Sequence, residues 1–380
     1  MSAFDFLNDP EKMRLLQQVE FDKQPNKKLV FVFSAPKVGS TSIVSSLRIF
    51  CSEDINVIHI HDEEMLYVLR KIKGITINEI ILYYSHIGKE VYVIDVYRSP
   101  IERKISAYFE KIGSYHFNNL DDKINTYNVD KVIVRFNNIF PYIALGDHFI
   151  DKYEIQKLPE KFDFSNKFLL IQQNGVKYIK LRLKDSSLWG DILTNIFNNN
   201  KKICIVKDYE SANKPIKDIY LRFKENYKIP INLLDEQMKC KFLNYYYSNE
   251  ELSEYYEYWK QRSGLPFTPF SEEQYKLYNC LTLENCHNDF IQTTHYMDEG
   301  CICKACTIKR NEIMNKVLNG LSLIESDKIY HDEAKQQLIN KRITNAVKMN
   351  KLIKNHIQKR DKEIRKDFKG DMQFIVNGLR

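Results

Sequence analysis

The segment SAPKVGSTS, at residues 34–42, places a lysine, a glycine and several hydroxyl side chains between an apolar run and a helix-like pattern. At a strand-to-helix junction, the free backbone N–H groups of the first helical turn and the positive end of the helix dipole favour an oxyanion. Lys37 would add a mobile positive charge, and Gly39 would allow close approach of the backbone to a ligand. The candidate anion-binding residues are Lys37, Val38, Gly39, Ser40, Thr41 and Ser42. They predict a phosphate or sulfate site, and the alternative is an ordinary turn with a Ser or Thr cap.

The residue order of this loop differs from that of a nucleotide-hydrolase loop. In the G-x-x-x-x-G-K-[ST] pattern the lysine directly follows the last glycine, whereas Lys37 precedes Gly39 by two residues. The order therefore disfavours magnesium-dependent ATP hydrolysis, and with it a P-loop kinase.

A second candidate phosphate clamp follows the predicted strand at residues 91–96. Ser99, Pro100 and Glu102 predict a helix start with a capping box. Arg98 is then expected at the carboxyl edge of a sheet, where α/β proteins bind ligands, with Ser106 two helical turns further on. Glu102 and Arg103 are explained by capping and by a solvated helix face.

Two histidines at the end of another predicted strand could supply a general base. His59 and His61 alternate in NVIHIHDEE, so both side chains are expected on one face. A neutral imidazole can accept a proton near pH 7. His61 is preferred because it is nearer the end of the strand, with His59, Glu63 and Glu64 as alternates. The alternative is a pair of sheet histidines bonded to neighbouring backbone.

The two phosphate-binding segments together resemble those of sulfotransferases that use PAPS, 3′-phosphoadenosine 5′-phosphosulfate. Residues 36–42 look like the loop that holds the 5′-phosphosulfate, and Arg98 with Ser106 is similar to the pair that holds the 3′-phosphate. The resemblance implies that Lys37 neutralises the bridging oxygen as the sulfuryl group leaves, without a metal. It also places a catalytic His or Glu near His61.

Within that superfamily, residues 28–262 resemble the bacterial putative capsular polysaccharide synthesis proteins. The matching segments are Lys180-Leu181-Arg182-Leu183 with Asp185, Asn213-Lys214 leading to residues 220–224, and Tyr245-Tyr246-Tyr247-Ser248 with Trp259. The resemblance implies a carbohydrate acceptor, in particular a polysaccharide hydroxyl, and adds Lys214 to the cofactor-binding residues. The chain departs from the family at residues 215–217, where Trp-Tyr-Ser is expected. That departure leaves open a second function. The chain would then be a catalytically weakened protein that binds 3′-phosphoadenosine 5′-phosphate (PAP) or another anion and acts through its C-terminal region.

The elements that must position these residues alternate in type along the chain. Apolar runs predict strands at residues 29–33, 56–60, 91–96, 168–172, 178–183 and 202–206, separated by helical patterns. Such alternation is typical of an α/β fold with a parallel sheet flanked by helices, as in the P-loop sulfotransferases that the chain resembles.

The composition changes along the chain and predicts four regions. These are an N-terminal helix at 1–24, a sulfotransferase-like α/β domain at 25–265, a Cys/His-rich segment at 271–308 and a helical Lys-rich region at 309–380. The segment SGLPFTPF at residues 263–270 is expected to be a linker.

Five of the eight cysteines lie between residues 280 and 306, together with two histidines. Thiolates hold Zn²⁺ tetrahedrally, so this density in a reducing compartment predicts a structural zinc site rather than disulfides. The preferred ligands are Cys280, Cys286, Cys301 and Cys306, followed by Cys303 and His295. The alternative is a set of incidental free cysteines.

Most of the positive charge lies near the C-terminus. Residues 341–369 carry eleven Lys and Arg against three acids, a net charge of +8, whereas the whole chain carries +7. The apolar spacing of this region predicts solvated helices that form a hairpin or self-associate, and the sharper hypothesis is a tail that binds an acidic polysaccharide or nucleic acid.

The remaining sequence features concern location. The longest apolar runs are far shorter than the roughly 20 residues that a membrane span needs, so no span is expected. The N-terminus MSAFDFLNDPEK lacks the basic and apolar regions of a secretory signal, and we therefore expect a cytoplasmic protein.

Overall fold

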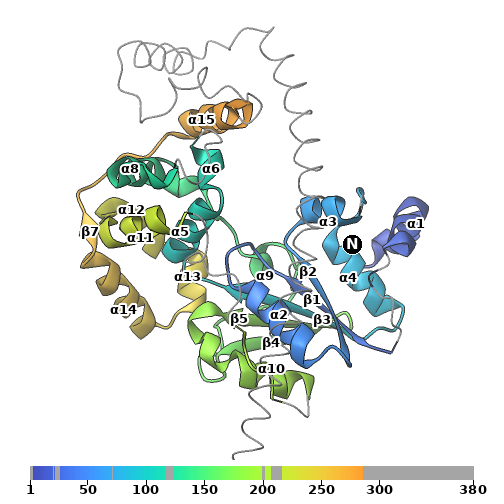
Figure 1. Cartoon of the computed structure of the whole chain (residues 1–380). Helices are drawn as coiled ribbons and strands as arrows, with labels where there is room; N and C mark the ends of the chain where they lie inside the picture. The colour runs from blue at the N-terminus through green and yellow to red at the C-terminus, as the bar shows by residue number, and fades with distance from the viewer. Residues whose placement is uncertain are drawn as a thin grey trace, which may run out of the picture.

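The computed structural model describes residues 3–19, 21, 26–70, 72–116, 124–198, 202–206 and 216–285. Its centre is a five-stranded sheet in the order β2-β1-β3-β5-β4 (Figure 1). The strands are β1 (Lys28–Phe33), β2 (Ile55–Ile60), β3 (Val91–Tyr97), β4 (Phe168–Gln173) and β5 (Val176–Arg182). Helices flank the sheet, which confirms the α/β fold class.

The sheet is parallel except at one edge, where β4 runs antiparallel to β5. The two strands are joined by Asn174 and Gly175, whose φ angles are +52° and +77°. An Asn-Gly pair with both φ angles positive makes the tight turn that closes a hairpin. The expectation of a wholly parallel sheet is therefore corrected at this edge strand.

The strand expected at residues 202–206 is absent, since the structure gives these residues no regular secondary structure. Side-chain hydroxyls take two of their backbone amides. The N–H of Ile203 donates to Thr194 Oγ1 at 2.9 Å, and that of Val206 donates to Ser46 Oγ at 2.8 Å. The apolar run packs beside two helices instead of joining the sheet.

The two faces of the sheet are covered by different helices. Val30, Val32 and Ile94 belong to the core cluster that contains the apolar residues of α2 (Ser40–Phe50) and α10 (Trp189–Phe197). Alternate residues, such as Phe31 and Val93, point to the opposite face and its larger cluster, which includes α4 (Ile77–His86). Burial on both faces explains why β1 and β3 are almost continuously apolar.

A group of helices extends this larger cluster beside the sheet, and Figure 1 shows α5, α8, α11, α12 and α14 gathered there. Their bounds are α5 (Pro100–Glu110), α8 (Val129–Ile139), α11 (Lys217–Asn226), α12 (Ile231–Met238) and α14 (Asn249–Lys260). The shorter or peripheral elements are η1 (Asp5–Asn8), α1 (Pro10–Gln18), α3 (Glu63–Arg70), α6 (Ile112–Tyr115), η2 (Phe140–Tyr142), α9 (His148–Asp151), η3 (Leu183–Leu188), β6 (Ile229–Pro230), α13 (Lys241–Tyr246), β7 (Ser263–Gly264) and α15 (Glu272–Asn285).

The chain stays in contact with this helical group beyond residue 262. Ser263 and Gly264 pair with β6, and the N–H of Phe270 donates to the Asn138 carbonyl. In α15 the ring of Tyr275 stacks on Tyr142 with centroids 4.3 Å apart. The segment expected to be a linker is thus held against β6 and α8 where the structure describes it. None of the described helices has the length and apolar character needed to cross a membrane.

The start of α5 is fixed differently from the expected capping box. Ser99 makes no side-chain cap hydrogen bond, and its hydroxyl instead lies 2.5 Å from Glu102 Oε2. The Glu102 carboxylate also accepts from Tyr255 Oη at 2.8 Å and Trp259 Nε1 at 3.1 Å, so it joins α5 to α14. Arg103 is 7% exposed, and its expected place on a solvated face is wrong.

A buried charged triad connects β3 and β5 just before their carboxyl ends. Lys180 Nζ lies 2.7 Å from Asp95 Oδ2 and 2.6 Å from Asp147 Oδ2, and all three residues are at most 4% exposed. Tyr246 Oη donates to Asp147 Oδ1 at 3.0 Å. Burial raises the pKa of Asp95 to about 6, although the nearby Lys180 opposes the shift. Removing the cation would leave two buried carboxylates without their partner.

We therefore predict that Lys180→Met lowers the free energy of unfolding by about 3–5 kcal/mol, measured by urea denaturation. The matched control is Lys177→Met on the same strand. Lys177 forms an ion pair with Glu90 at 2.8 Å, but its side chain is 33% exposed. This control should cost less than about 1 kcal/mol. If the two variants lost the same free energy of unfolding, the buried triad would contribute no more to stability than the exposed ion pair.

Candidate functional site

The loop between β1 and α2 presents the first helical turn without a side-chain cap. Gly39 is the N-cap residue of α2, has φ +92° and makes no side-chain cap hydrogen bond. The first-turn N–H groups are therefore not covered by a Ser or Thr cap, and such a helix start attracts an anion. This geometry favours the anion-binding interpretation of the loop over the ordinary capped turn.

Gly39 is required for packing as well as for its backbone conformation. A Cβ built on Gly39 would lie 2.9 Å from Leu183 Cδ1 and 3.3 Å from the Trp189 ring. The space where a Cβ would lie is taken up by η3 and α10, so Gly39 has a packing role, and its expected role in ligand approach stays a prediction. Val38 is 1% exposed and belongs to the same core cluster, so only its backbone could serve a ligand.

Arg98 lies directly against this loop. Its Nη1 donates to the carbonyl of Lys37 at 2.9 Å. The contact follows from the topology, because β1 and β3 are adjacent and parallel while β2 lies on the other side of β1. The chain order reverses between β1 and β3, and such a switch point is where open α/β sheets bind ligands. The structure thus brings together the two segments that the sequence singled out.

One nitrogen of this guanidinium has no hydrogen-bond partner in the described part of the chain. Arg98 Nε is buried and lacks a hydrogen-bond acceptor among the described residues, as does the hydroxyl of Ser34 at the end of β1. Burial lowers the pKa of Arg98, but a guanidinium stays charged at neutral pH. Ser106 lies two turns into α5 and is 7% exposed. An unpaired buried N–H of this kind is typical of a group that meets a ligand or an ordered water.

Lys37 is held by an acid that the sequence analysis missed. Lys37 Nζ lies 3.0 Å from Glu110 Oε2, and the lysine side chain is 13% exposed. Lys37 also has a left-handed backbone with φ +69°, unusual for a residue with a side chain. Glu110 ends α5, twelve residues after Arg98, and nothing in its spacing marks it as a partner.

The two candidate bases lie together, as the strand alternation predicted. The rings of His59 and His61 are 4.7 Å apart, and His59 Nε2 lies 3.1 Å from Ser40 Oγ. His61 Nδ1 lies 2.6 Å from the carbonyl of Ser34. Because a carbonyl only accepts, Nδ1 carries the hydrogen and Nε2 is the basic nitrogen when the ring is neutral.

Burial sets the protonation of these histidines. It lowers the pKa of His59 to about 3, with smaller contributions from His61 and Arg48. Burial also lowers the pKa of His61, and the charges of Lys37 and Glu110 act on that ring in opposite directions. His148, which the sequence analysis did not consider, contacts the His61 carbonyl through Nε2 at 2.7 Å. Both candidate bases are therefore neutral near pH 7.

The residues of the capsular-type resemblance form a buried network behind the site. Arg182 donates to Asp185 Oδ2 at 2.6 Å and to Glu251 Oε2 at 2.7 Å. Tyr246 reaches Asp147, and Ser248 forms a capping box with Glu251 at the start of α14. These residues join β5 to the helical group.

Several predicted site residues lie outside the described part of the chain. Lys214 is one of them, and so are Cys286, Cys301, Cys303 and Cys306. Cys280 lies in α15, but its side chain is not described. No group of three or more His, Cys, Asp or Glu side chains that could hold a metal ion occurs among the described residues, and the zinc site stays a prediction.

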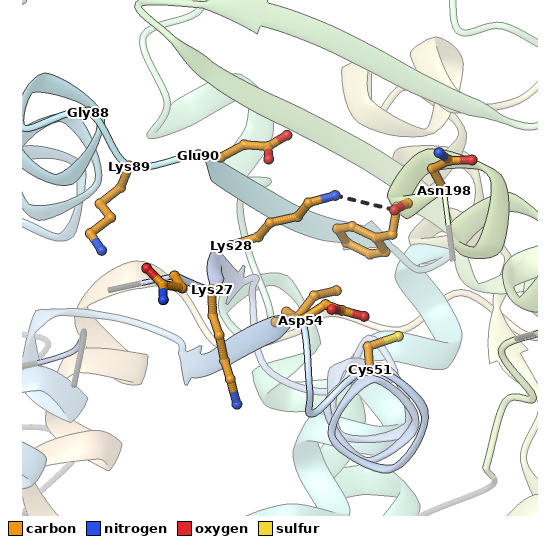
Figure 2. Close-up of a pocket in the computed structure, with 11 residues that line it drawn as sticks. Lys27, Lys28, Cys51, Asp54, Gly88, Lys89, Glu90 and Asn198 are labelled. Carbon is orange, nitrogen blue, oxygen red and sulfur yellow. Dashed lines mark hydrogen bonds between the residues drawn. The ribbon is translucent and has the colours of Figure 1, made fainter. Parts of the chain in front are cut away.

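Two cavities lie near opposite edges of the sheet. One of about 490 Å³ opens at the amino edge, between Lys27, Lys28, Lys89 and Asn198 (Figure 2). In Figure 2, Lys28 reaches across it to the main chain before Asn198, and its Nζ lies 3.3 Å from the Phe197 carbonyl. The other, of about 430 Å³, is lined by Arg98 and the first turn of α5. Only the second adjoins the candidate site.

Comparisons with known protein families, curated proteins and solved structures find no match for this chain.

The buried His59 gives a prediction about acid stability. With a pKa near 3 when folded and about 6.5 when unfolded, this imidazole binds a proton only in the unfolded chain between those values. Lowering the pH from 7 to 5 should therefore cost about 2 kcal/mol through His59 alone. We expect His59→Gln to reduce the pH dependence of the unfolding free energy by about that amount.

The control for this measurement is Ser40→Ala, which removes the contact to His59 but keeps the buried imidazole. It should retain the pH dependence of the parent chain, because burial is the main cause of the lowered pKa. If the unfolding free energy of His59→Gln depended on pH as that of the parent does, the lowered pKa of His59 would be contradicted.

Proposed function

We propose that this chain is a PAPS-dependent sulfotransferase that moves a sulfuryl group to a carbohydrate hydroxyl. The observation that carries the proposal is the contact of Arg98 with the Lys37 carbonyl at the switch point of the sheet, where Arg98 Nε has no partner among the described residues. Arg98 there lies against the main chain of the loop that carries Lys37, whose side chain reaches Glu110. Two cationic residues on neighbouring loops would suit a ligand with two anionic groups. The carbohydrate acceptor comes only from the resemblance of residues 28–262.

The binding roles follow from the donors available. The uncapped first turn of α2 and Lys37 would hold the 5′-phosphosulfate, while Arg98 and Ser106 would hold the 3′-phosphate. The donor set fits because all of these groups are cations or hydrogen-bond donors. Lys214 is proposed as a further cofactor-binding residue on the resemblance alone.

Two residues of this chain would act on the reacting groups. Bound PAPS supplies the sulfuryl group, whose bond to the phosphate oxygen breaks as the acceptor oxygen bonds to sulfur. Lys37 stabilises the charge left on the phosphate oxygen. His61 takes the proton of the carbohydrate hydroxyl at Nε2, because Nδ1 is hydrogen-bonded to the Ser34 carbonyl. His59 is the alternate base, although deeper burial makes it the weaker one.

A specific contact supports a second function, anion binding without turnover. The ion pair of Lys37 with Glu110 neutralises the cation that the transfer step needs. If the pair stays closed around a ligand, the chain would bind PAP and transfer nothing. In that case it would act through the basic residues 341–369 and a zinc segment, which lie outside the described residues apart from the start of α15.

We predict that Lys37→Met and Arg98→Met each weaken PAP binding by about tenfold or more, because each removes a charge-assisted hydrogen bond. Isothermal calorimetry on the full chain measures this. Lys89→Met, at the cavity on the opposite edge of the sheet, is the matched control and should bind PAP like the parent. Parent-like affinity in both site variants would refute the proposed binding site.

Transfer of labelled sulfate from PAPS to a panel of glycans separates the two functions. For the sulfotransferase, we expect the parent chain to label at least one glycan, and His61→Gln to bind PAP while losing most transfer. A parent chain that binds PAP without labelling any glycan supports the binding protein. Unchanged transfer by His61→Gln would move the base to His59 or a carboxylate.

A further inference from the structure

The cavity of about 430 Å³ beside Arg98 is enclosed by three parts of the helical group. They are the first turn of α5, residues 140–146 and the helices α12 and α13. Its volume lies within the range of pockets that hold small organic ligands. Among the predicted site residues, only Arg98 lines this cavity. The cavity is therefore distinct from the candidate phosphate-binding loop at residues 37–42.

The charged residues that line this cavity are mainly cations. Arg98, Arg103 and Lys104 line one side, and Glu236 is the one acidic residue in the lining. Arg103 Nη1 donates to the Gly146 carbonyl at 2.6 Å, and Lys104 Nζ donates to the Phe140 and Ile143 carbonyls at 2.8 and 2.7 Å. Burial lowers the pKa of Lys104 to about 8, so it remains mostly protonated at pH 7. The hydrogen-bond partners of these cations are neutral carbonyls, so the lining holds three cations against one acid. From outside the lining, the charges of Asp147 and Asp95 act on Arg103 and that of Glu102 acts on Arg98.

Three buried polar atoms of the lining lack a hydrogen-bond partner in the described chain. They are Tyr97 Oη, Arg98 Nε and Arg103 Nε. Tyr97 is 5% exposed, and its ring is fixed by stacking on Tyr246 at 4.4 Å. Native proteins leave few such atoms unpaired, and all three can donate. A group that completes their bonding can therefore be an acceptor, and the three cations against one acid in the lining favour an oxyanion.

The rest of the lining is apolar. Phe140, Pro141, Leu233, Phe242 and Pro269 contribute to it beside the cationic side. A free inorganic anion would leave this surface in contact with water, whereas a ligand with an apolar body would cover it. The two kinds of surface call for a ligand that is charged at one end and apolar at the other.

We propose that this cavity binds a small organic anion, with its oxyanion group at Tyr97, Arg98 and Arg103 and its apolar body against Phe140 and Phe242. This site goes beyond the proposed sulfotransferase function and does not depend on it. Arg98 belongs to both sites, so the experiment uses residues that belong to the cavity alone.

The probe is 1-naphthoate, and its neutral counterpart is 1-naphthalenemethanol, both titrated into the full chain by calorimetry. We expect saturable binding of the naphthoate and at least tenfold weaker binding of the alcohol. Tyr97→Phe removes a hydroxyl without a hydrogen-bond partner among the residues that the structure describes, so the fold should be kept while naphthoate binds about three- to tenfold more weakly.

Gln237 on α12 offers a matched pair of variants at the wall of the cavity. Gln237→Trp fills part of the space and should weaken naphthoate binding by more than about tenfold, whereas Gln237→Ala should bind like the parent. Thermal unfolding of both variants checks that they are folded. Lys37→Met should still bind naphthoate even where it loses PAP, which separates failure of this site from failure of the phosphate loop.

Three results would each overturn the proposal. They are no saturable naphthoate binding at about 1 mM, equal affinity for the alcohol, or unchanged affinity in folded Gln237→Trp.

Discussion

The hydrogen bond from Arg98 to the carbonyl of Lys37 is the constraint on which the candidate site depends. It joins the loop after β1 to the loop after β3, at the place where the order of the sheet reverses. The neighbouring strands cannot shift freely, because Lys180 is held between Asp95 of β3 and Asp147 in the buried core. The position of the guanidinium is therefore set by the sheet and not by the loop alone.

The sequence predicted the five strands of the sheet but not the antiparallel direction of the edge strand β4. Residues 29–33 are continuously apolar, and residues 91–96 are apolar except for Asp95, a pattern typical of strands buried on both faces. The antiparallel direction of β4 follows from the tight turn at Asn174 and Gly175. The alternation of strands and helices along the sequence does not reveal this local turn. The run at 202–206 has strand-like composition, yet the hydroxyls of Thr194 in α10 and Ser46 in α2 take two of its amides.

For the site, sequence reasoning placed residues that follow strands and failed for residues that reach it from elsewhere. Lys37, Arg98 and His61 each follow a parallel strand, so their proximity is a consequence of topology. Glu110 and His148 enter from the end of α5 and from α9, and no short-range spacing identifies them. Their effect is chemical, since one neutralises the lysine and the other fixes the main chain of the candidate base.

The central claim is that one ligand spans two anion sites with different tasks, and nucleotides with a single phosphate test it most directly. The affinities of adenosine 5′-monophosphate and adenosine 3′-monophosphate should be measured in the parent chain, Lys37→Met and Arg98→Met. The account predicts that Lys37→Met weakens only the 5′-monophosphate and Arg98→Met only the 3′-monophosphate, each by about tenfold. Equal losses for both nucleotides in both variants would contradict two separate sites.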